Sequence, residues 1–241
     1  MCKLMGLTFR ETTQRFSTQY YLRHFFDIFG PGNPHGWGFT FYDTADRAVL
    51  FKEAVPAPQS SMLKFLMESR SIQTQNVVAH VRLRSVGPII QELAQPFVEG
   101  NLSFAHNGTL YRLPQRIASD MSDSLYMFQQ MKYVRYTPHD ITNFLSKMNT
   151  YGGMSVIVSN GKFLIAYRDC GGAWPLHYRK IKPGYVISSM PFVSKTRWKM
   201  VPPGHSIIFE EGEMIDIIKG DATQATSTII TNTRTASGKF W

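Results

Sequence analysis

The chain has 241 residues, of which 43% are hydrophobic and 18% are charged, and its 26 lysines and arginines against 17 aspartates and glutamates give a formal net charge of +9. This composition excludes an intrinsically disordered chain, and without a run of roughly 18 apolar residues or a signal-peptide core we expect a cytoplasmic protein that does not enter a membrane. The basic residues are spread along the chain, so the charge does not predict nucleic-acid binding and suits anionic small substrates equally well.

Alternation of apolar and polar residues predicts antiparallel strands that pair as hairpins. The clearest turn signal is Asn160-Gly161, because this dipeptide favours the positive φ angles of a two-residue hairpin turn. The predicted strands are residues 37–42, 48–52, 76–85, 154–158, 162–167, 184–189, 205–209 and 214–218.

Three segments have the apolar spacing of amphipathic helices, namely residues 60–69, 124–132 and 137–148. The third begins with Thr137-Pro138, which supplies an N-cap hydroxyl and a proline at the first helical position. The methionines of these helices belong to apolar stripes, and we expect them to fill the core.

Many hairpins and few helices, without strict β-α alternation, predict an α+β domain with layered antiparallel sheets. We expect this domain to span residues 1–220. From Asp221 onward threonine, serine and alanine dominate, and residues 221–241 are predicted to form a loosely held tail.

The two cysteines, Cys2 and Cys170, exclude a disulfide framework and zinc or redox sites of the CxxC type. The seven histidines form no metal-binding pair on a helix, and no glycine-rich phosphate-binding loop is present. We therefore predict neither a metal nor a cofactor.

Cys2 has two interpretations. It can be a small apolar residue near a frayed terminus. Alternatively, aminopeptidases remove an initiating methionine before a small residue, and Cys2 would then carry a free α-amine beside its own thiol. An α-amine titrates near ~7.7–8.0 and can accept the proton of a thiol whose reference pKa is about 8.5. One residue would thus supply both nucleophile and base.

The strand 76–85 places Val78, His80, Arg82 and Arg84 on one face and an apolar set on the other. Arg82 follows an apolar run, and a buried guanidinium needs an anionic partner. Either this face is an ordinary solvent-exposed one, or Arg82 receives a substrate carboxylate.

Residues 102–110 contain Asn107-Gly108, which is first of all a hairpin-turn signal. The same tight turn would expose the Asn107 amide and the Gly108 N–H side by side, as an oxyanion hole requires. Asp123 also has two interpretations. It can be a helix-terminal acid facing the helix dipole, or a carboxylate that accepts a substrate ammonium group.

Taken in order, these motifs resemble the class-II glutamine amidotransferases, a group of N-terminal-nucleophile hydrolases, and most closely their stand-alone glutaminase-like branch. The resemblance runs from Met1 to about residue 209. It rests on residues 1–6 (MCKLMG), 34–39 (PHGWGF), 79–82 (AHVR), 104–108 (FAHNG), 122–124 (SDS) and 198–204 (WKMVPPG).

The resemblance implies a four-layer αββα sandwich and an amidohydrolase that acts on glutamine or a γ-glutamyl compound. It implies that Cys2 attacks the amide to form a γ-glutamyl thioester and release ammonia or an amine. Asn107 and Gly108 would hold the oxyanion. Arg82, helped by Ser85, would bind the substrate α-carboxylate, and Asp123 would bind the α-ammonium group.

The sequence departs from the family pattern at three places. The motif at residues 34–38 lacks an acid, Gln95-Pro96-Phe97 stands where His-Pro-Phe is expected, and Leu125 replaces an acidic residue. A catalytically weak or inactive basic interaction module on the same fold is therefore the alternative function. The ammonia acceptor would be a separate synthase subunit, and a homo-oligomer stays open.

Overall fold

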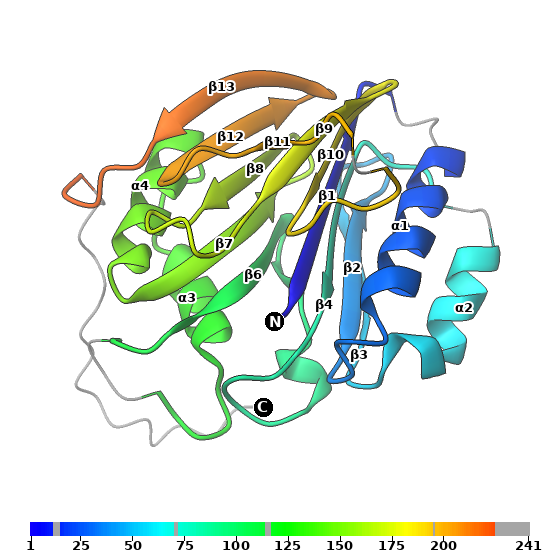
Figure 1. The fold of residues 1–241 in the computed structure, drawn as a ribbon, viewed down its shortest axis with the longest axis horizontal. Helices are drawn as coiled ribbons and strands as arrows, with labels where there is room; N and C mark the ends of the chain where they lie inside the picture. The colour runs from blue at the N-terminus through cyan, green and yellow to red at the C-terminus, as the bar shows by residue number, and fades with distance from the viewer. Residues whose placement is uncertain (12–14, 70–71, 114–116, 195, 225–241) are drawn as a thin grey trace.

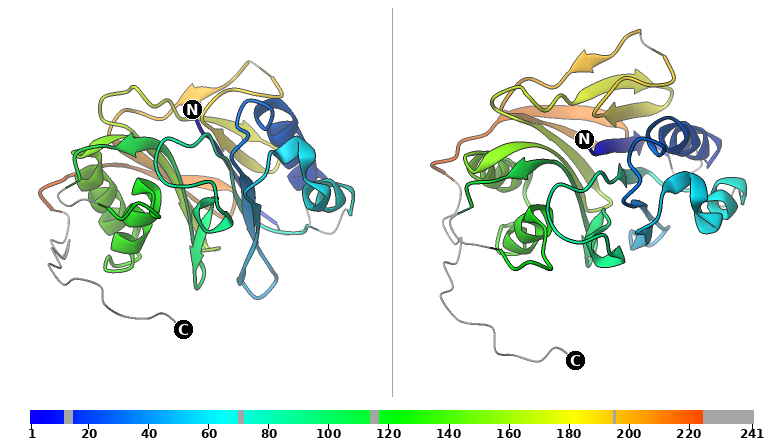
Figure 2. Two further views of the ribbon diagram at one scale, coloured as in Figure 1. Left: turned by 90° about the horizontal axis from the view of Figure 1, so that it is seen from below. Right: turned by 60° about the horizontal axis from the view of Figure 1, so that its bottom comes forward.

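Two antiparallel sheets pack face to face between two pairs of helices (Figure 1). The structure is a computed structural model that describes residues 1–11, 15–69, 72–113, 117–194 and 196–224. Residues 15–17 are described by their backbone only. Seen from below, the helices, the two sheets and the second pair of helices follow one another as four layers (Figure 2). The predicted α+β class and αββα layer order are confirmed.

The first sheet carries the amino terminus of the chain on its central strand. Its seven strands run in the order β11-β9-β10-β1-β4-β2-β3, and every neighbouring pair is antiparallel. The strands are β1 (Lys3–Phe9), β2 (Trp37–Tyr42), β3 (Ala48–Glu53), β4 (Asn76–Val81), β9 (His177–Ile181), β10 (Gly184–Ser188) and β11 (Lys199–Met200).

The second sheet has six antiparallel strands in the order β13-β12-β8-β7-β6-β5. They are β5 (Phe97–Glu99), β6 (Leu102–Leu110), β7 (Gly152–Ser159), β8 (Phe163–Arg168), β12 (His205–Glu210) and β13 (Glu213–Lys219). The predicted turn at Asn160-Gly161 joins β7 to β8, with Gly161 at φ 90°.

Each sheet is covered by two helices on its outer face. Helices α1 (Arg15–Phe29) and α2 (Ser61–Glu68) pack on the first sheet, and α3 (Asp123–Met131) and α4 (Pro138–Asn149) pack on the second. Two short 3-10 helices, Ala57–Gln59 and Gln91–Leu93, lie in connections. Helix α4 begins as predicted, because the Thr137 hydroxyl accepts a hydrogen bond from Asp140 N.

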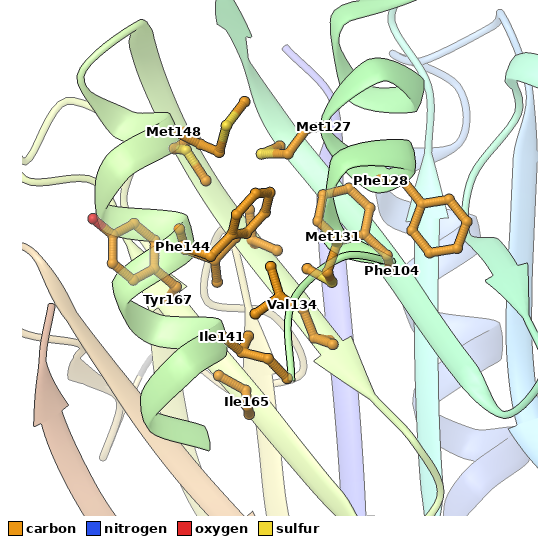
Figure 3. Packing of buried hydrophobic residues seen from close by; sticks show 14 of the residues in the cluster. Phe104, Met127, Phe128, Met131, Val134, Ile141, Phe144, Met148, Ile165 and Tyr167 are labelled. Atoms are coloured by element: carbon orange, nitrogen blue, oxygen red, sulfur yellow. The ribbon is translucent and has the colours of Figure 1, made fainter. Parts of the chain in front are cut away.

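The core has three parts, one under each helix pair and one between the sheets. The layer between the sheets contains Leu4, Val78, Ala105, Ile157 and Leu164, all fully buried. Under α3 and α4, Met127, Met131 and Met148 surround Phe144 (Figure 3). The methionine stripes are core residues, as the sequence predicts.

Helix α1 is an addition to the three helices that the sequence predicts. Its buried residues Leu22, Phe25, Phe26 and Phe29 recur with helical spacing. Aromatic residues have only modest helix propensity, so the segment has little intrinsic preference for a helix. Contact with the sheet therefore determines its structure.

No helix within the described ranges is long and apolar enough to cross a membrane. The described part of the chain extends to residue 224, and residues 225–241 of the predicted tail lie outside it. The domain boundary at residue 220 stays a prediction.

Candidate functional site

Cys2 directly precedes β1, the strand that is flanked by β10 and β4. Its Sγ atom accepts a hydrogen bond from the backbone nitrogen of Leu83 at 3.2 Å and lies 3.3 Å from the Leu83 carbonyl oxygen, to which the thiol donates. The side chain is half-buried, and Met1 before it is 58% exposed. The bond between Met1 and Cys2 is therefore at the protein surface.

The electrostatic surroundings of Cys2 come from the other predicted site residues. Burial raises the pKa of the Cys2 thiol above its usual value, whereas the Leu83 N–H, the positive amino terminus and Arg82 lower it and Asp123 raises it. Arg82 and Asp123 are thus close enough to Cys2 to affect its ionisation. Because the net shift is upward, the thiol needs a base to become a nucleophile.

Arg82 follows the last residue of β4 and is held there by the motif at residues 34–38. Its backbone nitrogen donates to Gly36 O at 2.8 Å, and its carbonyl accepts from His35 N at 3.0 Å. These two bonds continue the pairing of β4 with β2 beyond the strand ends. The motif that lacks the family's acid therefore still fixes the backbone of Arg82.

The Arg82 side chain is 4% exposed, as the apolar run before it suggests. Its guanidinium donates to Pro88 O at 2.8 Å and Val86 O at 3.1 Å. Within the described residues it has no carboxylate within 4.0 Å, so the expected anionic partner is replaced by carbonyl groups. Three of its five N–H groups remain for a ligand.

Asn107 and Gly108 lie within β6, so the predicted hairpin turn at this dipeptide is wrong. They pair with Ser155 and Met154 of β7, and the strand continues to Leu110. The local preference of Asn-Gly for a turn is overridden because β7 continues to pair with β6 beyond it. The side chain of Asn107 is 3% exposed, and its Oδ1 has no hydrogen-bond partner among the described residues.

A glycine is required at position 108 because the backbone of β7 approaches it closely. A Cβ at this position would lie 2.1 Å from Gly153 O, 2.6 Å from His106 Nε2 and 2.8 Å from Met154 Cα. Two of these atoms belong to the backbone of β7 and cannot rotate away. The position therefore accepts only glycine without a shift of the strands.

Asp123 is the first residue of α3 and is 2% exposed. Ser122 is the N-cap, because its hydroxyl accepts from Leu125 N at 3.1 Å. The carboxylate of Asp123 instead accepts from Leu110 N at 2.8 Å, at the end of β6. This bond uses Oδ2, so Oδ1 of the Asp123 carboxylate can accept a hydrogen bond from a ligand.

Three contacts connect the predicted site residues into one region. Cys2 bonds to Leu83, the Thr109 hydroxyl donates to the exposed Ser85 hydroxyl at 3.3 Å, and Leu110 bonds to Asp123. Segments that are distant in the sequence therefore converge between the ends of β1, β4 and β6.

Two buried histidines lie behind this region and were not among the predicted site residues. His80 is fully buried, and neither ring nitrogen has a hydrogen-bond partner among the described residues. His106 Nδ1 lies 2.8 Å from Ser124 Oγ, and burial lowers the pKa of His106 while Asp123 raises it. The alternation of residues 76–85 places His80 on the same face as Arg82, and this pattern could have identified His80 as a residue near the site.

Gln95, at the place of the family's histidine, accepts a hydrogen bond from His106 N through Oε1 at 2.7 Å. It thereby supports the residue that precedes Asn107. Leu125, at the place of the family's acid, packs beside the core under α3. These departures therefore alter the surroundings of the site residues and leave the residues themselves in place.

Cys170 is the second cysteine of the chain. It follows β8, is exposed, and its Sγ atom is 3.2 Å from the Tyr167 hydroxyl. In the described ranges no three histidine, cysteine, aspartate or glutamate residues gather as a metal site would require.

Comparison with known proteins gives a consistent family. A family model described as glutamine amidotransferases class-II matches residues 1–185. An uncharacterized protein of Methanocaldococcus jannaschii is 24% identical over 258 residues, covering 89% of this chain and 71% of its own.

Solved structures share the fold at low sequence identity. The glutamine phosphoribosylpyrophosphate amidotransferase of Bacillus subtilis aligns with a TM-score of 0.66 and 18% identity, over 91% of this chain and 49% of its own. A class-II glutamine aminotransferase domain protein of Silicibacter pomeroyi aligns with a TM-score of 0.62 and 17% identity, over 91% of this chain and 100% of its own. The chain thus spans about half the length of the Bacillus protein.

Proposed function

The chain belongs to the class-II glutamine amidotransferases, and we propose that it hydrolyses the side-chain amide of glutamine or of a γ-glutamyl compound with Cys2 as the nucleophile. The observation that supports this most directly is the contact of Cys2 Sγ with the backbone of Leu83, the residue after Arg82. Through this contact the Cys2 thiol lies beside the residue that follows Arg82, whose guanidinium suits the carboxylate of an amino-acid substrate.

The base in this proposal is the α-amine of Cys2, which removal of Met1 sets free. While Met1 is present, the nitrogen of Cys2 is an amide and cannot accept a proton. After removal, the amine takes the thiol proton as the thiolate attacks the amide carbon. The raised pKa of the buried thiol makes such a base necessary.

The reaction then follows a two-step acyl transfer. The attack forms a tetrahedral intermediate whose oxyanion is stabilised by the Asn107 amide and the Gly108 N–H. The protonated amine gives its proton to the leaving nitrogen, and ammonia or an amine departs from a γ-glutamyl thioester. The same amine then deprotonates a water molecule, which cleaves the thioester to glutamate and the free thiol.

The zwitterionic head of the substrate needs one cation and one anion. We assign its α-carboxylate to the free N–H groups of Arg82, with Ser85 as a further donor, because a guanidinium binds a carboxylate through two parallel hydrogen bonds. We assign its α-ammonium group to Asp123. The fate of the ammonia is a further part of the proposal, with release to water or transfer to a separate synthase subunit as the two outcomes.

Glutamate release by the purified protein without a partner tests this function. We expect glutamine to be hydrolysed by the wild-type protein and by Cys170→Ser, and not by Cys2→Ser. A diazo-ketone analogue of glutamine should label Cys2 alone. Labelling of Cys170, or an inert protein whose amino-terminal Cys2 is free, would favour the interaction module instead.

A further inference from the structure

We propose that the cavity between β9, the segment 197–199 and helix α1 binds a phosphorylated small molecule that carries a planar ring, as a nucleotide does. The cavity has a volume of about 700 Å³. It shares no lining residue with the predicted glutaminase site, and β10 separates its strand β9 from β1, which follows Cys2 (Figure 1). This is a second site, independent of the glutaminase reaction.

The lining of the cavity is strongly cationic. It contains five basic residues and no acidic residue, the basic ones being Arg179, Lys180, Lys182, Arg197 and Lys199. Only Lys180 has an ion-pair partner among the described residues, Glu213 at 3.6 Å. Four cations around one concave surface repel each other unless an anion lies between them.

Arg179 gives the most specific indication of an anionic ligand. Its Nε is buried and has no hydrogen-bond partner among the described residues. A buried N–H without an acceptor is costly, and a guanidinium is the preferred donor for the paired oxygens of a phosphate. Arg179 is therefore the residue we assign to the phosphate.

The segment 197–199 holds two of the cations toward the cavity. Trp198 points the other way, since its ring packs on Phe192 with 5.9 Å between centroids and its Nε1 donates to Ser194 O at 2.6 Å. Arg197 has φ 66° and precedes the extended backbone of β11, and both Arg197 and Lys199 are in the lining of the cavity.

Three tyrosines are also in the lining, which Ile181 and Met214 complete. Tyr178 and Tyr185 pack against the core between the sheets, whereas Val186, the partner of Arg179, packs under α1, so of the three only Tyr21 lies on the same face as Arg179 and offers a surface for a ring there. Tyr178 and Tyr185 lie with 6.5 Å between ring centroids, and Tyr21 of α1 lies near Arg179, which lowers its pKa against the larger upward effect of burial. Aromatic rings and arginine planes stack on bases. Cations alone would suit any polyanion, whereas the Tyr21 ring beside Arg179 suits phosphate joined to a ring.

The volume favours a small ligand over a polymer. Cavities of roughly 300–1,000 Å³ hold cofactor-sized molecules. In the part of the chain that the structure describes, strand β9 has no partner beyond Tyr178 on the side of β11, because β11 pairs only with His177 and Tyr178. An acidic peptide that added a strand there would engage the backbone of β9 but would leave the Tyr21 ring without a role.

The test is calorimetric titration of the full chain at about 0.15 M salt, where exposed charges are screened beyond roughly 8 Å. The probes are ATP, adenosine, inorganic tripolyphosphate, a ten-residue uridine oligonucleotide and a peptide of ten glutamates. We expect ATP to bind saturably with one molecule per chain. Tripolyphosphate should bind more weakly than ATP, and adenosine should not bind at the same concentrations.

The matched variants are Arg179→Gln and Arg135→Gln. Each removes one guanidinium charge, but Arg135 is exposed and pairs with Asp140 at the start of α4, far from the cavity. Arg179→Gln should weaken ATP binding about tenfold or more, and Arg135→Gln should leave it unchanged. If Arg179→Gln does not fold, Lys182→Gln combined with Arg197→Gln, both at exposed positions, should give the same loss.

Four results would overturn the proposal. They are no saturable ATP binding, equal binding of ATP and tripolyphosphate, a much tighter complex with the oligonucleotide or the glutamate peptide than with ATP, and equal losses in the Arg179 and Arg135 variants. Glutamine hydrolysis measured on the same variants should not change, so that failure of this site and failure of the glutaminase assignment are distinguishable.

Discussion

The thiol of Cys2 is held by both backbone groups of Leu83, with Sγ 3.2 Å from the nitrogen and 3.3 Å from the carbonyl oxygen. This contact places the start of β1 against the segment that follows β4. Arg82 is the first residue of that segment, and its guanidinium bonds to two carbonyl groups further along it. A single connection between two strands thus carries both the proposed nucleophile and the proposed carboxylate receptor.

Replacing Arg82 by lysine should raise KM for glutamine by about tenfold or more, because a point charge cannot make two parallel hydrogen bonds to a carboxylate. Arg84→Lys is the matched control, since Arg84 is exposed and its contact with His35 involves only its backbone nitrogen. Steady-state kinetics of both variants provide the measurement. Equal KM values in Arg82→Lys and the wild-type protein would remove Arg82 from the substrate site.

Replacing Asn107 by alanine should lower kcat by roughly 10²–10³-fold, the usual effect of losing one oxyanion donor. Stability should change little, because no hydrogen bond of the Asn107 side chain is present among the described residues and its Oδ1 is unpaired. Asn101→Ala, at an exposed turn, is the control. An unchanged kcat in Asn107→Ala would mean that this side chain is only part of the sheet.

Gly108→Ala should destabilise the protein by about 1–3 kcal/mol, in the range of other overpacked sites. The added methyl group would meet Gly153 O at 2.1 Å, so β6 and β7 would have to separate locally. Gly32→Ala is the control, since a Cβ there meets nothing within 4 Å. Urea unfolding of the two variants measures the difference, and equal midpoints would contradict the close approach seen at Gly108.

Acid should destabilise the protein through His80. Burial lowers the pKa of His80 from 6.5 to about 3, so between these pH values the unfolded chain binds a proton that the folded chain does not. The free energy of unfolding therefore falls as the pH is lowered from 6.5 to about 3. His80→Leu, which removes this proton uptake, should flatten that part of the curve.

The control for this pH dependence is His139→Leu at an exposed position of α4. Thermal unfolding midpoints of the three proteins between pH 7 and pH 4 give the comparison. The account of His80 is contradicted if His80→Leu and wild-type protein lose stability in parallel.

The sequence predicts those features that depend on neighbouring residues. The turn at Asn160-Gly161 and the cap at Thr137 follow from local backbone preferences, and both are present. The same local rule fails at Asn107-Gly108, because pairing with β7 continues beyond the dipeptide. The sequence does not predict helix α1 for a related reason. Its aromatic residues have little local preference for a helix, and their packing on the first sheet determines the helical structure.

The arrangement of the site depends on contacts that no local pattern contains. Asp123 reaches Leu110, and Cys2 reaches Leu83 across 81 positions of the chain. The motifs predict which residues belong together only through the family resemblance. Which groups pair with them, such as the carbonyls around Arg82, depends on how the connecting segments fold back.

The most direct test of the account is the intact mass of the protein purified from cells, measured together with glutamine hydrolysis. We predict a mass that lacks Met1, with a free α-amine on Cys2, because the proposed base exists only after that cleavage. A protein that keeps Met1, or carries a blocked amino terminus, and still hydrolyses glutamine would contradict the role of the Cys2 amine.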